Sequence, residues 1–276
     1  MPFAYVMIRG EPQYRADAFK QGLRASGFTI HGAPRAQPTN ADDVLVIWNR
    51  YGRFNHYAEV FERAGARVIV AENGFLGRDT PGGPWYSLCS SLPLACGSWP
   101  TFHGEDWRWD EIAHASGARI CEWRKDGNEI IILAQRGIGP PGVRQPDGWH
   151  RRTAEQLKAA GHRVRVREHP GEKPPPISLE DDLRNARAVV TWASGAAFKA
   201  LLLGVPVLYG CEQWVGRDAA TFLRVSRNLE ISLPERLPTF RRLAWSCWRI
   251  PEIVTGLPFR RLLWPSSESV STTAPR

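Results

Sequence analysis

Short apolar runs alternate with segments of helical periodicity through the first part of the chain. The apolar runs predict buried strands at residues 5–10, 28–32, 42–49 and 67–74. The periodic segments 14–27 and 55–65 each end at a glycine and predict helices. This order of strands and helices predicts a parallel sheet that is covered by helices on both faces.

The same alternation restarts after a break near residues 110–128. Strands are predicted at residues 129–137, 163–170, 188–194 and 205–210. Helices are predicted at residues 149–161, 178–186 and 195–204, with Ser178 as the N-cap of the second. We therefore predict an α/β protein of two Rossmann-like domains facing a cleft, with residues 1–120 in the first domain and 121–232 in the second.

Three regions depart from this alternation. Residues 75–109 are rich in Gly, Pro, Ser and Trp and lack periodicity, which is typical of a functional or mobile loop. A short helix is predicted at 109–117, and residues 233–264 have a helical pattern. The polar residues 265–276 are predicted to be a disordered tail.

Several classes of protein are disfavoured by missing motifs. No G-x-G-x-x-G follows the first strand, and the chain lacks a P-loop motif, an HExxH motif and a G-x-S-x-G elbow. The five cysteines include no Cys-x-x-Cys pair, so reduced thiols in a cytoplasmic protein are expected. Residues 1–10 do not resemble a signal peptide, and no apolar run reaches the ~18 residues of a membrane span.

The chain is basic, and this favours anionic partners. It has 36 basic and 28 acidic residues, a net charge of +8. Nucleic acids, sugar nucleotides and anionic glycans all remain open as partners.

Two turns of the second domain could bind phosphate. His169 follows a predicted strand in an Arg-x-His-Pro sequence, where its ring N–H could donate to phosphate and Pro170 would fix the chain. Ser194 and Gly195 form a strand-to-helix turn, where backbone N–H groups attract anions. The alternatives are a capping or buried histidine and a serine that is a plain N-cap.

Basic side chains lie near these turns. Arg163, Arg165 and Arg167 alternate with valines, so this strand either borders the cleft or lies at a sheet edge. Arg167 is nearest the carboxyl end and is the best phosphate candidate of the three. Lys199 falls one turn into the following helix, where it could face ligand or solvent.

Further polar residues end other predicted strands. Glu72 and Asn73 end the fourth strand of the first domain, where a carboxylate could act as a general base or could instead cap a helix or stabilise a loop. Gln135 and Arg136 end the first strand of the second domain and could contact a donor. Of the twelve tryptophans, Trp85 could stack on an acceptor, although most are expected in the core.

These residues resemble a known family. Arg-x-His-Pro, followed about 25 residues later by Ser-Gly-x-x-x-x-Ala-Leu-x-x-Gly-x-Pro-Val, is similar to the donor half of GT-B glycosyltransferases. The likeness is to bacterial capsule polysaccharide enzymes of the Kdo-transferase type. Glu-Asn-Gly-Phe at 72–75 is similar to the acidic-x-Gly-Phe of their acceptor half, and Leu-Ala-Gln at 133–135 resembles the start of their donor half.

The resemblance implies that His169, Pro170, Ser194 and Gly195 bind the donor's nucleotide phosphates. One departure is that Lys199 stands where the family usually has a glutamate that holds the ribose. A lysine prefers phosphate or another anion to a diol. The chain is also short for a two-domain transferase, as in stripped-down enzymes that phage genomes carry.

The sequence therefore predicts a metal-independent glycosyltransferase that uses a nucleotide-sugar donor, without a further cofactor. The acceptor is a saccharide or a hydroxymethylated base in DNA, which would have to be flipped out of the duplex. The DNA alternative depends on a basic C-terminal region, whose residues would otherwise form a solvated face or clamp the domains: Arg241, Arg242, Trp245, Trp248, Arg249, Arg260 and Arg261. A non-catalytic nucleotide- or nucleic-acid-binding protein on a degenerate scaffold is the competing hypothesis.

Overall fold

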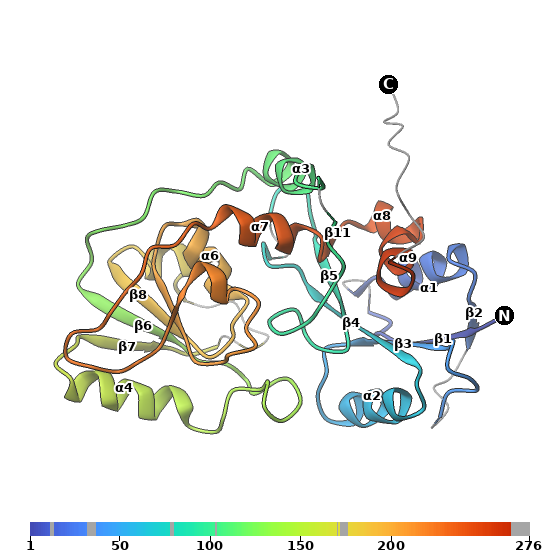
Figure 1. Ribbon diagram of the computed structural model, residues 1–276, viewed down its shortest axis with the longest axis horizontal. Helices are drawn as coiled ribbons and strands as arrows, with labels where there is room; N and C mark the ends of the chain where they lie inside the picture. Colours follow the sequence, from blue (N-terminus) through green and yellow to red (C-terminus); the bar gives the residue numbers. More distant parts are fainter. Residues whose placement is uncertain are drawn as a thin grey trace.

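The protein consists of two α/β domains that lie side by side (Figure 1). A computed structural model describes residues 1–11, 14–31, 37–77, 80–102, 104–169, 171 and 176–265. Within these residues no helix is long and apolar enough to cross a membrane.

The first domain is built on a six-stranded sheet of order β11-β5-β4-β3-β1-β2. Its parallel strands are β1 (Phe3–Met7), β2 (Thr29–His31), β3 (Val44–Trp48) and β4 (Arg67–Asn73). Helices α1 (Ala16–Ala25) and α2 (Arg53–Arg63) cover opposite faces. Because side chains alternate along β3, Val46 packs in the core under α1 and Ile47 in the core under α2.

Residues 75–109, predicted to be a loop, contain a strand. β5 (Tyr86–Ser90) pairs antiparallel with β4, so the first sheet is mixed rather than fully parallel. The strand has only five residues and all but the last are buried, so period-two alternation was not visible in the sequence. Helix α3 (Trp107–Ser116) then leads out of the domain, close to the predicted 109–117.

The second domain is built on a parallel five-stranded sheet of order β10-β9-β8-β6-β7. The strands are β6 (Glu129–Leu133), β7 (Val164–Arg167), β8 (Ala186–Thr191), β9 (Val207–Tyr209) and β10 (Thr221–Phe222). The helices are α4 (Trp149–Ala159), α5 (Leu179–Asp182) and α6 (Ala196–Leu202). The expected N-cap is present, since the Ser178 hydroxyl accepts from the Asp181 N–H.

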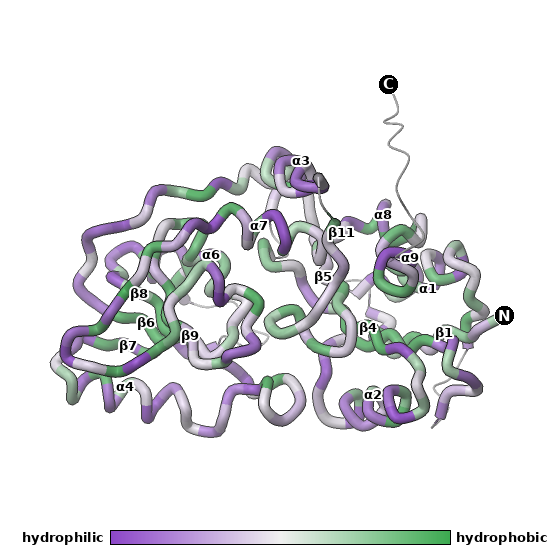
Figure 2. The backbone as a smooth tube through the Cα atoms, in the orientation of Figure 1, coloured by the Kyte–Doolittle hydropathy of each residue, from purple (hydrophilic) through white to green (hydrophobic). Residues whose placement is uncertain are grey.

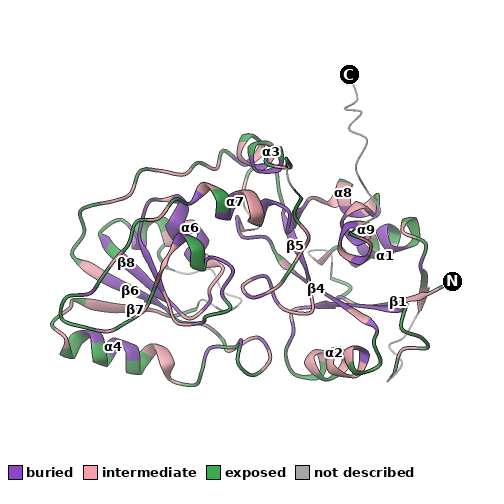
Figure 3. Ribbon diagram, viewed as in Figure 1, coloured by how far each residue is buried: buried purple, intermediate pink, exposed green. Residues whose placement is uncertain are grey.

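The alternation of arginine and valine in β7 has a simple cause: β7 is the edge strand of its sheet. It is half-buried along its whole length, whereas β6 and β8 are mostly buried (Figure 3). Hydrophobic residues follow the central strands, while hydrophilic residues predominate along α4 (Figure 2). An edge strand needs only one apolar side, so polar side chains are tolerated along β7, although burial lowers the pKa of the Arg167 guanidinium.

The C-terminal segment returns to the first domain. Residues 233–264 form α7 (Leu237–Ala244), β11 (Cys247–Trp248), α8 (Ile250–Val254) and α9 (Leu257–Leu263). The helical prediction was right for the helices but missed β11, which pairs antiparallel with β5. Helix α8 packs on α1 (Figure 1). The tail beyond residue 265 lies outside the described residues.

One hydrophobic cluster joins the two domains. Phe75 from the first domain contacts Phe198 of α6 and Phe240 of α7, with ring centroids 6.1 and 5.9 Å apart. Trp109 of α3 also packs on Phe240, at 5.2 Å. The core therefore continues from one sheet to the other and holds their facing edges in place.

Candidate active site between the two sheets

The polar residues expected at strand ends lie at the carboxyl edges of the two sheets. Glu72 and Asn73 end β4, and Gln135 and Arg136 follow β6. His169 follows β7, and Ser194 with Gly195 follows β8. Ligands of open parallel sheets bind at this edge.

Glu72 is held in a desolvated position at the end of β4. The Leu94 N–H donates to Glu72 Oε2 at 2.8 Å. Burial raises the pKa of this carboxyl from 4.5 to about 7, against the opposing effects of the Leu94 hydrogen bond and the positive charge of Arg136. A carboxylate with this pKa can take up a proton near neutral pH.

Arg136 is the link between the two domains' polar residues. Its positive charge acts on Glu72 of the first domain and on His169 of the second, lowering the pKa of both groups. The side chain is exposed, and within the described part of the chain it makes no hydrogen bond or ion pair. An unpaired guanidinium at this position is available to an anionic ligand.

His169 is positioned as a neutral hydrogen-bond donor. The Gly171 N–H donates to His169 Nδ1 at 2.9 Å, so the neutral ring carries its proton on Nε2. Burial, together with the charge of Arg136, lowers its pKa from 6.5. Pro170, the expected partner of this histidine, lies outside the described residues.

The Ser194–Gly195 turn is fixed by hydrogen bonds from its neighbours. The Gln135 side chain accepts from the Ala193 N–H at 2.9 Å and donates to the Ala193 carbonyl at 3.0 Å. The Ser194 hydroxyl accepts from the Ala196 N–H at 3.2 Å. Gln135 thus orients the turn, and the turn itself is open: an added Cβ on Gly195 would meet no atom within 4 Å.

Two predicted phosphate ligands are paired with carboxylates instead. Arg167 forms an ion pair with Asp182 and donates to the Ile177 carbonyl at 3.0 Å. Lys199 forms an ion pair with Glu180 of α5. The sequence did not show these pairings, because they depend on how β7, α5 and α6 pack; the acidic run Glu180–Asp182 was the only available signal.

Trp85 does not lie where an acceptor could reach it. It is fully buried in the hydrophobic cluster that joins the two domains, and the Arg249 guanidinium lies 5.2 Å from its ring centre. The expected role of Trp85 in stacking on an acceptor is therefore wrong, because the ring faces are covered by protein.

Asn73 is exposed at the end of β4, and its carbonyl accepts from the Ser87 hydroxyl at 3.4 Å.

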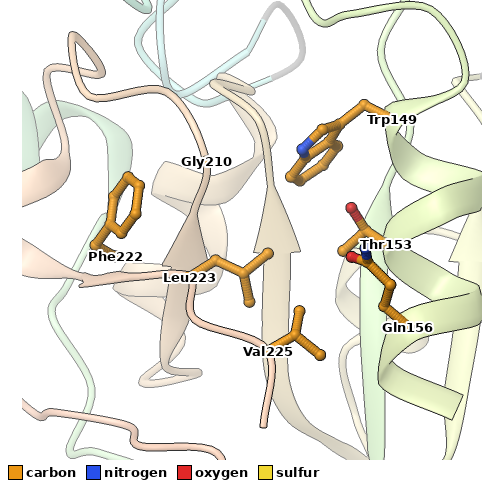
Figure 4. Close-up of a pocket in the computed structure, with 7 residues that line it drawn as sticks. All are labelled: Trp149, Thr153, Gln156, Gly210, Phe222, Leu223 and Val225. Carbon is orange, nitrogen blue, oxygen red and sulfur yellow. The ribbon is translucent and has the colours of Figure 1, made fainter. Parts of the chain in front are cut away.

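A pocket of about 490 Å³ lies on the α4 side of the second sheet. Trp149, Thr153 and Gln156 line one wall from α4, and Phe222, Leu223 and Val225 line the opposite wall (Figure 4). Gly210, after β9, closes one end beside Trp192. No lining residue is charged, which suits an uncharged ring. This pocket was not predictable from the sequence, because residues 220–232 lack periodicity.

The basic C-terminal region is engaged within the molecule. Arg261 forms a bidentate pair with Glu105 at 2.9 and 2.7 Å, and its guanidinium lies 3.8 Å from the ring centre of Trp245. The others also have internal partners: Arg241 with Asp106, Arg242 with Val215 and Asp218, Arg249 with Glu111 and Glu252, and Arg260 with the Thr255 carbonyl.

In the described residues, no group of three or more His, Cys, Asp or Glu side chains is placed to hold a metal ion.

No protein-family model and no curated protein sequence matches the chain. Solved structures, in contrast, are similar to the chain. The Thermosulfurimonas dismutans KpsC beta Kdo 2,7 transferase matches with a TM-score of 0.54 at 14% identity, covering 94% of this chain and 99% of that chain. The KpsC beta Kdo 2,4 transferase of the same organism matches with a TM-score of 0.54 at 12% identity, covering 94% and 98%.

These similarities show the fold. The chain has the two-domain Rossmann-like arrangement of GT-B glycosyltransferases, and the expected likeness to Kdo transferases is confirmed at the level of structure. Because the alignments cover nearly all of both partners, the chain is not short compared with these structures.

Proposed function

We propose that this chain is a glycosyltransferase that moves a sugar from a nucleotide-sugar donor to an acceptor hydroxyl without a metal ion. The observation that carries the proposal is Glu72, a desolvated carboxyl with a pKa of about 7 whose charge interacts with Arg136 of the other domain. The shared fold with two Kdo transferases supports it.

The proposed reaction is a direct displacement. The acceptor hydroxyl gives its proton to the Glu72 carboxylate, and its oxygen forms a bond to the anomeric carbon of the donor sugar. The bond between that carbon and the donor phosphate oxygen breaks, and the electron pair leaves with the nucleotide phosphate. Arg136 and the Nε2–H of His169 stabilise the negative charge that develops there.

The remaining residues hold the donor. The Ser194 N–H donates to the Thr191 hydroxyl and the Ala196 N–H to the Ser194 hydroxyl, so the group that this turn offers to the phosphate is the Gly195 N–H. Gln135 keeps the turn in place. In this proposal Arg167 and Lys199 act in the donor site together with their paired carboxylates, so their net contribution to phosphate binding is smaller than that of the unpaired Arg136.

We infer that the acceptor is a saccharide. The C-terminal arginines that would contact DNA are paired with internal partners. Transfer to hydroxymethylated duplex DNA would overturn this assignment.

A second candidate function is nucleotide binding without turnover. The pairing of Lys199 with Glu180 favours it, since this removes one of the cations that a leaving phosphate would need. Binding of a nucleotide sugar with no product formed from any acceptor supports this candidate over the transferase.

The test is a screen of nucleotide-activated sugars, activated Kdo among them, for binding by calorimetry and for turnover with saccharide acceptors. Turnover by the wild type is the expected result.

His169→Ala should weaken nucleotide binding by about 1–3 kcal/mol, the range for a lost hydrogen bond to a charged group. The matched control is His162→Ala, whose ring contacts the Ser226 carbonyl at the opposite end of β7. Equal affinities for the two variants would remove His169 from the donor site.

A further inference from the structure

We propose that Cys96 and Cys211 are a modification site, where oxidation forms a reversible disulfide that fastens the two domains together beside Glu72. Cys96 belongs to the loop after β5 in the first domain, and Cys211 follows β9 in the second. The two residues are 115 positions apart in the sequence.

The two sulfur atoms are already in contact. Cys96 Sγ and Cys211 Sγ lie 3.8 Å apart, and both residues are buried. A disulfide bond is about 2.05 Å long, so the sulfur atoms must approach by only about 1.8 Å. The Val215 N–H donates to the Ala95 carbonyl at 2.9 Å, which holds the two chain segments together next to the pair.

The chemistry of the pair distinguishes the two thiols. The two sulfur atoms share an S–H···S hydrogen bond in which either thiol can be the donor, and this interaction lowers the pKa of Cys211 and raises that of Cys96. Cys211 is therefore the thiolate that reacts first, and Cys96 is the resolving thiol.

With a peroxide as oxidant, the reaction balances in two steps. The Cys211 thiolate attacks one peroxide oxygen, the O–O bond breaks, and hydroxide leaves with the electron pair to give a sulfenic acid. The Cys96 sulfur then attacks the Cys211 sulfur, the S–O bond breaks, and water leaves with the thiol proton. Two thiols lose two electrons, and the peroxide is reduced to water and hydroxide.

The disulfide would act on the candidate site directly. Leu94, whose N–H holds the Glu72 carboxylate, lies two residues from Cys96 in the same loop. A covalent link from this loop to Cys211 fixes the first domain's general base relative to the second domain's strand ends. Motions of one domain against the other, which are common during substrate entry and product release, would then be restricted.

The other three cysteines provide internal controls. Cys89 and Cys247 are fully buried, and burial raises the pKa of both thiols, to about 11 for Cys247. Cys121, on the segment between the domains, is the only cysteine that is not buried. An oxidant that acts by accessibility alone would therefore modify Cys121 first, whereas the proposal directs it to the 96–211 pair.

The test treats the reduced full-length protein with hydrogen peroxide and maps cross-linked peptides by mass spectrometry. The expected product loses two hydrogen atoms, joins the peptides of Cys96 and Cys211, and is reversed by dithiothreitol. Its midpoint of thermal unfolding should rise above that of the reduced protein, because the link closes a long loop.

Cys96→Ser and Cys211→Ser should each abolish the cross-link, and Cys121→Ser should leave it intact. In Cys96→Ser, a sulfenic acid trapped by dimedone on Cys211 is expected. A cross-link that joins Cys89 to Cys247 would overturn the proposal, and so would oxidation of Cys121 while Cys96 and Cys211 stay reduced. These readouts do not depend on transferase activity, so the proposed function can fail while this inference stands.

Discussion

Glu72 owes its proposed role to its surroundings. The residue type is common at strand ends, but the Leu94 N–H orients this carboxyl and burial moves its pKa from 4.5 to about 7. A general base works best when its pKa lies near the operating pH. The positive charge of Arg136, in the other domain, also acts on Glu72, which brings proton uptake and charge stabilisation to one site.

Replacing Glu72 should change stability in a pH-dependent way. The folded protein binds this proton more tightly than the unfolded chain, so the free energy of unfolding falls as pH rises from 4.5 to about 7. Glu72→Gln has no carboxyl group to ionise, so it removes this pH-dependent loss of stability. Its side-chain oxygen can still accept a hydrogen bond from the Leu94 N–H. We expect the variant to be more stable than wild type by about 1–3 kcal/mol at pH 8 and nearly equal at pH 4.5, as measured by urea denaturation. A difference that does not depend on pH would contradict a buried, titrating Glu72.

The strand pattern predicted the positions of the candidate residues at strand ends but not their partners. The positions of Glu72, Arg136 and His169 were predictable because each follows a strand whose carboxyl end lies at the ligand-binding edge of its own sheet. The pairing of Arg167 with Asp182 and of Lys199 with Glu180 was not, since ion pairs between separate segments are set by side-chain packing. The same limit applies to Trp85, which is fully buried and has Arg249 of the distant C-terminal segment over its ring.

At the scale of elements, the C-terminal helices complete the first domain. Helix α8 crosses α1 so closely that an added Cβ on Gly22 would lie 1.9 Å from the Ile253 carbonyl oxygen and 2.8 Å from the Phe259 ring. The predicted helices and strands are largely confirmed because their apolar periodicity is strong. β5 was missed because it lacks the β-branched run of the predicted strands and lies in a Gly- and Pro-rich segment, and β10 and β11 were missed because two residues show no period.

Gly22→Ala should therefore destabilise the protein. Alanine is a better helix former than glycine by about 1 kcal/mol, but the clash with backbone atoms of α8 outweighs this gain. We expect a net loss of about 1–3 kcal/mol in the free energy of unfolding, typical of an overpacked contact. The control is Gly10→Ala, where an added Cβ meets no atom within 4 Å. Wild-type stability of Gly22→Ala would mean that α8 does not pack on α1 in this way.

At the scale of the whole molecule, the net charge differs from the charge that is available to bind an external anion. The chain carries +8, yet the C-terminal arginines are paired with internal carboxylates and carbonyls. Arg108 also has internal partners. It is buried between Glu111 and Glu252, where α3 meets the C-terminal segment. These cations connect segments that the sequence places far apart, so the net charge alone does not indicate a surface for nucleic acid.

Binding to duplex DNA should accordingly be weak and depend little on salt. Each phosphate contact would lower log affinity by about 0.9 per log unit of salt, so a slope below about 1 is expected from the paired arginines. A salt titration by fluorescence anisotropy measures it. A slope that corresponds to several phosphate contacts, and that falls in Arg241→Ala or Arg260→Ala, would support the DNA acceptor instead.

The central claim is that one carboxylate of the first domain activates an acceptor for a donor held by the second. The most direct measurement is the turnover of Glu72→Gln beside wild type, as a function of pH, with a donor that both proteins bind. Wild-type turnover should rise with pH up to about pH 7, where Glu72 loses its proton. The variant should lose about two to four orders of magnitude in turnover while binding the donor normally. Near-normal turnover of Glu72→Gln, with the same pH profile as wild type, would contradict the account.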